Sequence, residues 1–140
     1  MKRVFFDASV LFSAIYSSYG GSYALVRLAL KGEIMGVTTK SIIEELYENM
    51  HKIKKASKQR VDIFIQTHKL MVRERMTHKE IEQYIGLVEE KDTHVVVGAL
   101  LSHCDFLVTL DKKHLDNVET KKLFNKQIHI VSPKELLRLV

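Results

Sequence analysis

Short segments rich in apolar residues alternate along the chain with amphipathic segments, and this alternation limits the possible folds more than any other feature. Four such segments stand at residues 2–6, 34–37, 106–108 and 128–131. We expect them to be strands that are buried on both faces. Buried strands separated by helices are typical of a parallel sheet with helices packed on each side. The sequence therefore predicts an α/β fold, a three-layer α/β/α sandwich with a central parallel sheet.

Helix-start patterns mark several of the segments between the strands. The sequences THKE at 77–80 and SPKE at 132–135 have the residues of a capping box. Either Thr38 or Thr39 can cap the helix that follows the second strand. Residues 54–60 carry no such pattern, and we expect them to form a hinge or an exposed connection.

The composition is that of an ordinary globular domain, and the 140 residues suit a single domain, residues 1–140. No apolar run reaches the roughly 18 residues of a membrane span, and the N-terminus lacks a signal-peptide pattern. The single cysteine, Cys104, excludes an internal disulfide. We therefore expect a cytoplasmic protein without membrane association. The net charge of +5 is compatible with nucleic acid as a partner, although charge alone favours the simpler interpretation of solubility.

Acidic residues occur beside three of the four predicted strands. Asp7 directly follows the first strand, and Glu44 and Glu45 lie in the first two turns of the helix after the second. Asp111 comes shortly after the third strand, and Asp92 stands at the start of the helix that leads into it. Because ligands of open parallel sheets bind outside the carboxyl ends of the strands, we expect these acids to converge on one rim.

Convergent carboxylates repel one another, and a divalent cation relieves this repulsion. Carboxylate oxygens suit Mg²⁺ or Mn²⁺, which accept phosphate oxygens and activate water. The reaction class implied is metal-dependent hydrolysis of phosphodiester bonds. Each acid also has a simpler interpretation, as a helix cap for Asp7 or Asp92, a solvated side chain for Glu44 or Glu45, and a turn residue for Asp111. For any one acid alone, the simpler interpretation is favoured. The placement of all these acids at strand ends favours a metal site.

Four segments together resemble the PIN domain, the compact ribonuclease fold of the VapC toxins of toxin–antitoxin pairs and of RNA-processing nucleases. They are VFFDASVL at 4–11, VTTKSIIEEL at 37–46, EEKDTHVVVGAL at 89–100 and DFLVTLDKKHL at 105–115. The last two are the most specific, because an acid opening a helix and a following strand that ends in Thr-x-Asp form a characteristic pair. The resemblance extends from residue 3 to about residue 132.

The resemblance implies a role for each acid. The implied metal ligands and catalytic residues are Asp7, Glu45, Asp92 and Asp111. Glu44 is the alternative to Glu45, about 100° away around the helix. The implied supporting residues are Ser9, Glu89 and Thr109. The seven histidines form no ligand motif, and we expect ordinary surface or core roles for His94 and His114 near the rim.

The function expected from this resemblance is that of an endoribonuclease that uses Mg²⁺ or Mn²⁺ and a metal-activated water to hydrolyse RNA. It is either the toxin of a toxin–antitoxin pair, with an antitoxin protein as its partner, or an RNA-processing enzyme. The resemblance also implies a homodimer, with residues 57–87 as the contact surface. The alternative is a PIN-fold RNA-binding or assembly module without nuclease activity of its own. Haloacid-dehalogenase phosphatases are excluded because Ser9 stands where their second aspartate is required.

Overall fold

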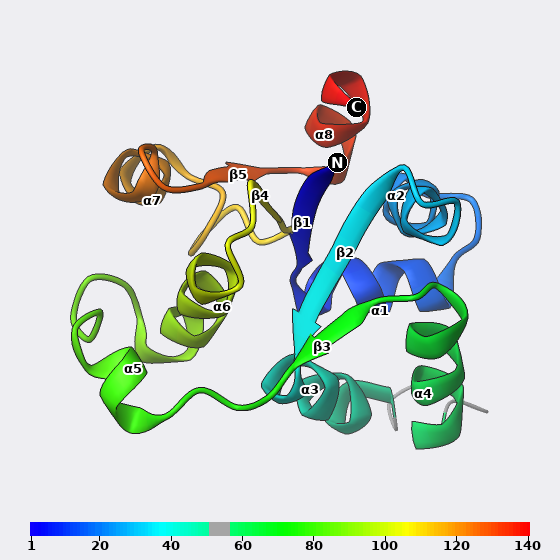
Figure 1. Cartoon of the computed structure of the whole chain (residues 1–140), viewed down its shortest axis with the longest axis horizontal. Coiled ribbons are helices and arrows are strands. Elements are labelled where there is room, and N and C mark those ends of the chain that lie inside the picture. Colours follow the sequence, from blue (N-terminus) through cyan, green and yellow to red (C-terminus); the bar gives the residue numbers. More distant parts are fainter. Residues whose placement is uncertain (51–56) are drawn as a thin grey trace.

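The computed structural model describes residues 1–50 and 57–140 and contains one five-stranded sheet flanked by helices (Figure 1). The elements, in chain order, are β1 (Lys2–Phe6), α1 (Ala8–Tyr16), α2 (Gly21–Leu30), β2 (Ile34–Thr39), α3 (Lys40–Met50), α4 (Lys58–Thr67), β3 (Met71–Arg73), α5 (His78–Glu82), α6 (Glu90–Leu101), β4 (Phe106–Val108), α7 (Val118–Phe124), β5 (His129–Val131) and α8 (Pro133–Leu139). Within the described ranges, no helix combines the length and the apolar character that crossing a membrane requires.

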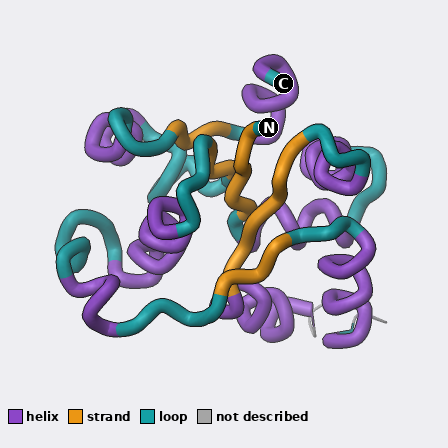
Figure 2. Tube along the Cα trace, viewed as in Figure 1, coloured by secondary structure: helices purple, strands orange, loops and turns teal. Residues whose placement is uncertain are grey.

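The strand order is β3-β2-β1-β4-β5, and every neighbouring pair is parallel. The predicted three-layer sandwich with a central parallel sheet is thereby confirmed. β1 lies at the centre, where Val4, Phe5 and Phe6 are fully buried. Figure 2 shows the strands running side by side through the middle of the molecule, with helices on both flanks. The central strand is apolar because both of its faces are covered.

Consecutive phenylalanines of β1 show how the two faces are filled. Successive side chains of a strand point to opposite sides of a sheet. Phe5 therefore faces α6, where its ring lies against Gly98, and Phe6 faces the opposite layer, where its ring lies against Gly36 of β2 beside Ala29 of α2. Both glycines allow close packing, since a side chain at either position would enter space that these rings already occupy.

The fifth strand, β3, was not among the predicted strands. It has three residues, and its Met71 and Val72 are exposed at the edge of the sheet, where they pair only with β2. A short exposed edge strand gives no apolar run, so the pattern that revealed the four buried strands is missing here.

The predicted helix starts are mostly confirmed. Both capping boxes form, with Thr77 and Ser132 as the capping residues. The strand after α2 continues to Thr39, whose hydroxyl accepts a hydrogen bond from the Ile42 N–H at 3.3 Å, so Thr39 is the capping residue of the pair. Of the expected connection 54–60, residues 54–56 lie outside the described residues. Residues 58–60 are exposed but belong to α4, which corrects the expectation for that part.

The close packing of α6 on the sheet gives a first prediction. A methyl group at Gly98 would lie 3.0 Å from Thr39 Cγ2 and 3.1 Å from Phe5 Cζ. We expect Gly98→Ala to lower the free energy of unfolding by about 1 kcal/mol, because overpacking outweighs the better helix propensity of alanine. Thermal unfolding followed by circular dichroism should show a Tm about 4 °C lower.

The matched control is Gly21→Ala at the first position of α2. A methyl group there meets its nearest atoms at 3.6 Å, which is an ordinary contact. We expect an unchanged Tm for this variant. An equal Tm for both variants would contradict the packing described for α6.

Candidate active site

Asp7 begins the candidate site at the carboxyl end of β1. Its side chain is 7% exposed, and its backbone N–H donates to the Val108 carbonyl at 3.1 Å, which continues the pairing of β1 with β4. The Asp7 carboxylate also caps α1, because Oδ1 accepts a hydrogen bond from the Ala8 N–H at 2.8 Å. The simpler interpretation of Asp7 as a helix cap is therefore correct, but it accounts for only one of the two carboxylate oxygens.

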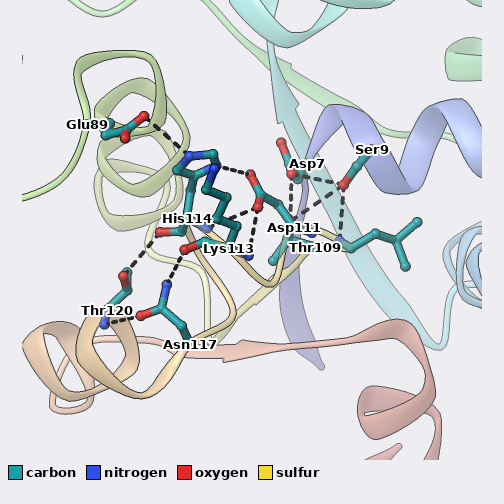
Figure 3. Close-up of polar contacts among 10 residues, drawn as sticks. Asp7, Ser9, Glu89, Thr109, Asp111, Lys113, His114, Asn117 and Thr120 are labelled. Atoms are coloured by element: carbon teal, nitrogen blue, oxygen red, sulfur yellow. Dashed lines mark hydrogen bonds and ion pairs between the residues drawn. The ribbon is translucent and has the colours of Figure 1, made fainter.

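Two hydroxyl groups hold the other oxygen, Oδ2. Thr109 Oγ1 donates to it at 2.7 Å and Ser9 Oγ donates at 3.0 Å (Figure 3). The same hydroxyls accept backbone hydrogen bonds from the turn after β4, Thr109 from the Asp111 N–H and Ser9 from the Leu110 N–H. Thr109 and Ser9 thus fix the turn after β4 against the end of β1, which is a supporting geometry for Asp7.

Burial sets the electrostatic state of Asp7. Desolvation raises the pKa of its carboxyl above the ordinary value, the hydrogen bonds from Thr109, Ser9 and the Ala8 N–H oppose this, and the charge of Asp111 raises the pKa further. The native fold therefore holds this carboxylate at an electrostatic cost that a nearby cation would remove.

Asp111 lies beside Asp7 in a contrasting environment. Its Oδ1 accepts hydrogen bonds from the N–H groups of Lys113 and His114, at 3.1 and 3.0 Å. Partial burial acts to raise the pKa of Asp111, but the hydrogen bonds from His114 and Lys113 outweigh it, and the pKa lies below its ordinary value. Asp111 therefore carries its negative charge readily, next to an aspartate that does so at a cost.

His114 connects two of the acids across the rim. Its Nδ1 lies 3.1 Å from Asp111 Oδ2, and its Nε2 lies 3.4 Å from Glu89 Oε2 (Figure 3). One ligand atom from each of Glu89, Asp92 and His114 lies within 4.8 Å of the others, as a group that holds a metal ion would require. The contacts of His114 with Asp111 and Glu89 were not among the expectations from the sequence. Its position three residues after Asp111 was the only signal available in the sequence.

Asp92 lies in the first turn of α6 and is 6% exposed. The interpretation of Asp92 as a helix cap is wrong, because the cap position belongs to Glu89, whose side chain makes no capping hydrogen bond. A negative charge in the first turn is favoured by the helix dipole, which helps α6 to hold a buried carboxylate.

A cleft of about 1340 Å³ brings the predicted acids together. Its lining includes six acidic residues, Asp7, Glu45, Glu89, Glu90, Asp92 and Asp111. Among the described residues, the lining contains no lysine or arginine. Glu44 is not part of the lining and instead forms an ion pair with Arg75. The geometry therefore places Glu45 on the cleft and Glu44 outside it.

The chemistry of this donor set fits a hard divalent cation. The six carboxylates are oxygen donors for a metal ion. Among the described residues, the cleft lining holds no lysine or arginine and a single histidine, His94, so this group of acids needs a positive charge from elsewhere. Asp7, Glu45, Asp92 and Asp111 come from four different elements or their ends, so the tertiary fold is what gathers them.

Known proteins share this sequence pattern and this fold. The family model of the PIN domain matches residues 3–113. A solved structure with similar architecture is VapBC2 from Rickettsia felis bound to a DNA fragment from their promoter, with a TM-score of 0.61 and 16% identity over 93% of this chain and 98% of that chain. No protein of curated function matches the sequence. Because the family model spans most of the residues, the chain belongs to the PIN domain family.

Proposed function

We propose that this protein is a metal-dependent endoribonuclease of the PIN type. The observation that carries the proposal is the cleft at the carboxyl ends of the strands, in which six acids gather without a lysine or arginine among the described residues. A binding module for RNA alone has no use for such a lining, because carboxylates repel phosphates. A hydrolase that binds divalent cations requires it.

The four residues proposed to hold Mg²⁺ or Mn²⁺ are Asp7, Glu45, Asp92 and Asp111. When bound, the metal would neutralise phosphate charge and lower the pKa of a water molecule, as divalent ions do in hydrolases. Ser9 and Thr109 orient the Asp7 carboxylate through Oδ2, and His114 orients Asp111 through its ring and its N–H. Glu89 is proposed as a supporting acid, since it contacts His114 at the same rim.

Basic side chains near the rim would hold the RNA backbone. Lys112 and Lys113 follow Asp111 directly and are exposed. They lie in the turn that Thr109 and Asp111 fix by hydrogen bonds, so their backbone positions are set relative to the acids. Lysines placed next to an acidic cleft bind the flanking phosphates while the metals bind the scissile one.

We also propose that the protein is the toxin of a toxin–antitoxin pair. The similarity of its fold to a chain of VapBC2 supports a protein partner of the antitoxin kind. A homodimer is supported by the exposed apolar side chains between residues 57 and 87, which are Ile63, Met71, Val72, Ile85 and Leu87. A free, buried thiol at Cys104 is consistent with the cytoplasm as the compartment.

The nuclease is tested with purified protein and single-stranded RNA. We expect cleavage that requires Mn²⁺ or Mg²⁺ and stops with EDTA. Asp7→Asn should lower the cleavage rate by more than about 100-fold, because changes to residues that merely orient a metal ligand already cost 10- to 100-fold. Cleavage that survives EDTA, or equal rates for both proteins, would sink the proposal. RNA binding without any cleavage would favour the alternative of a binding or assembly module.

A second experiment separates Glu45 from Glu44. We expect Glu45→Gln to lower the Mn²⁺-dependent cleavage rate by at least about 10-fold, as loss of a charged ligand does. Glu44→Gln is the matched control, because Glu44 pairs with Arg75 outside the cleft and should leave the rate near that of the wild type. The reverse result, a large loss at Glu44 alone, would show that the ligand had been assigned to the wrong residue.

The stability of Asp7→Asn gives a test that needs no activity. Burial raises the pKa of Asp7 in the native state above the ordinary pKa of 3.8. At pH values between these two pKa values, the native state therefore binds more protons than the unfolded state. The stability of the wild type falls as the pH rises through this window. At neutral pH in EDTA we expect the Tm of the variant to be a few degrees higher. Each kcal/mol by which the free energy of unfolding rises, once the buried charge is removed, raises the Tm by about 4 °C.

The gain should disappear below pH 3.8, where the wild-type carboxyl is protonated. Added Mn²⁺ should raise the Tm of the wild type by mass action and leave the variant nearly unchanged. Differential scanning calorimetry measures both effects. A wild type that is insensitive to Mn²⁺ would contradict metal binding at Asp7.

A further inference from the structure

The cleft continues beyond the acids, between α1 and α3. The residues of α1 that line it are Ala8, Ser9, Phe12, Ser13 and Tyr16, and those of α3 are Ser41, Ile42, Glu45 and Asn49. In both sets the lining residues recur every three or four positions, once per helical turn, so each helix turns one face toward the cleft. With a rise of 1.5 Å per residue, Phe12 and Tyr16 lie about 7.5 and 13.5 Å beyond Asp7 along the axis of α1. The acids therefore occupy one end of a groove whose other part is lined by different chemistry.

Two aromatic rings follow each other along the α1 side of the groove. Phe12 is half-buried, whereas Tyr16, at the last position of α1, is 69% exposed. The two are four residues apart, which places them on neighbouring turns of the same helix face. An exposed aromatic ring on the wall of a cleft offers a flat surface on which another ring can stack.

Polar groups with hydrogen-bonding capacity surround the far end of the groove. The Asn49 amide on α3 lines it and has both a donor and an acceptor group, as a nucleobase edge requires. This end of the groove thus combines an aromatic ring with an amide.

The two ends of the groove suit different parts of a nucleotide, because only one end is lined by acids. The acids repel a phosphate unless divalent cations neutralise them, so the scissile phosphate belongs at the metal site. A nucleobase is uncharged and stacks on an aromatic face whatever its identity.

We propose that the groove between α1 and α3 is a binding site for an unpaired nucleobase, stacked on Tyr16 and supported by Phe12. This inference rests on the proposed ribonuclease function and adds the substrate form: a single strand whose base is free to leave its neighbours. A base that is paired in a duplex cannot reach Tyr16 while its phosphate lies at the acids. Tyr16 therefore selects for unpaired RNA near the cleavage point.

The test measures RNA binding separately from cleavage. All proteins keep Asp7 and are titrated with Ca²⁺ in place of Mn²⁺, so that a divalent cation neutralises the acids. A fluorescein-labelled single strand of mixed sequence is followed by fluorescence anisotropy, and a gel checks that it stays intact. Tyr16→Ala should weaken binding by about 5- to 140-fold, the range expected for loss of one base–aromatic stack. Tyr16→Phe keeps the ring and should stay within about 2-fold of its parent.

Tyr19→Ala is the matched control. Tyr19 is 97% exposed, lies three residues after Tyr16 and does not line the cleft, so its loss should leave the affinity unchanged. The same RNA annealed to its complement should bind equally well with or without Tyr16. Equal losses at Tyr16 and Tyr19, or a loss at Tyr16 that is as large for the duplex, would overturn the stacking site. Binding that ignores Tyr16 altogether assigns the groove to another occupant, such as a segment of a protein partner, and overturns the proposal as well.

A second measurement needs no variant at Tyr16. A single strand containing 2-aminopurine should lose fluorescence on binding, because stacking on an aromatic ring quenches this base, and an unquenched complex would contradict the proposal. The nuclease assay with the wild type separates the two proposals. If the wild type cleaves RNA with Mn²⁺ but RNA binding does not depend on Tyr16, the stacking site alone is rejected. If binding depends on Tyr16 but no cleavage occurs, the stacking site is supported and the nuclease is rejected.

Discussion

The burial of one negative charge, that of Asp7, is the constraint on which the rest of the site depends. A carboxylate that is 7% exposed loses most of its hydration, and the fold compensates with the Ala8 N–H and two hydroxyl groups. These donors fix the direction of both oxygens, but none of them carries a full positive charge. The remaining electrostatic cost would favour binding of the proposed divalent cation at this position. The three residues before Asp7, Val4, Phe5 and Phe6, are fully buried, and this packed segment holds the carboxylate at the rim.

The sheet pairing brings the second acid to the first. Phe6 of β1 is paired with Val108 of β4, so the residues that follow each strand, Asp7 and Thr109, are neighbours. The Thr109 N–H donates to the Val131 carbonyl of β5, which fixes the end of β4 on its other side. Asp111 follows two residues later. Parallel strands place their carboxyl ends at one edge, and the distance between the two aspartates in the sequence is irrelevant to their distance in space.

The parts of this structure that the sequence predicts are those in which a local pattern reports burial. Segments rich in apolar residues revealed β1, β2, β4 and β5, and the ends of β1 and β4 gave the positions of Asp7 and Asp111. β3 was not predicted, because an exposed edge strand has no apolar run in its sequence.

Tertiary contacts decided what the sequence left open. Glu44 and Glu45 are equally acidic and adjacent, and only the packing of α3 turns one toward the cleft and the other toward Arg75. His114 joins Glu89 across a sequence separation that no motif describes. The place of Tyr16 on the groove could not be predicted either, because no sequence pattern distinguishes a tyrosine at a helix end that lines a groove from one that does not.

The charge of the whole chain and the charge of its cleft have opposite signs, and this opposition has a consequence for the reaction. A net charge of +5 would attract the RNA substrate of the proposed ribonuclease at long range, where the sum of all charges acts. At short range the six acids of the cleft repel the same phosphates. Attraction to the surface and entry into the cleft are therefore separate steps with different requirements, because salt screens the first and bound divalent cations permit the second. For the proposed ribonuclease, RNA would therefore be attracted by the net charge of the protein in the absence of metal but would reach the acids only with the cations in place, so the order of events favours metal before substrate.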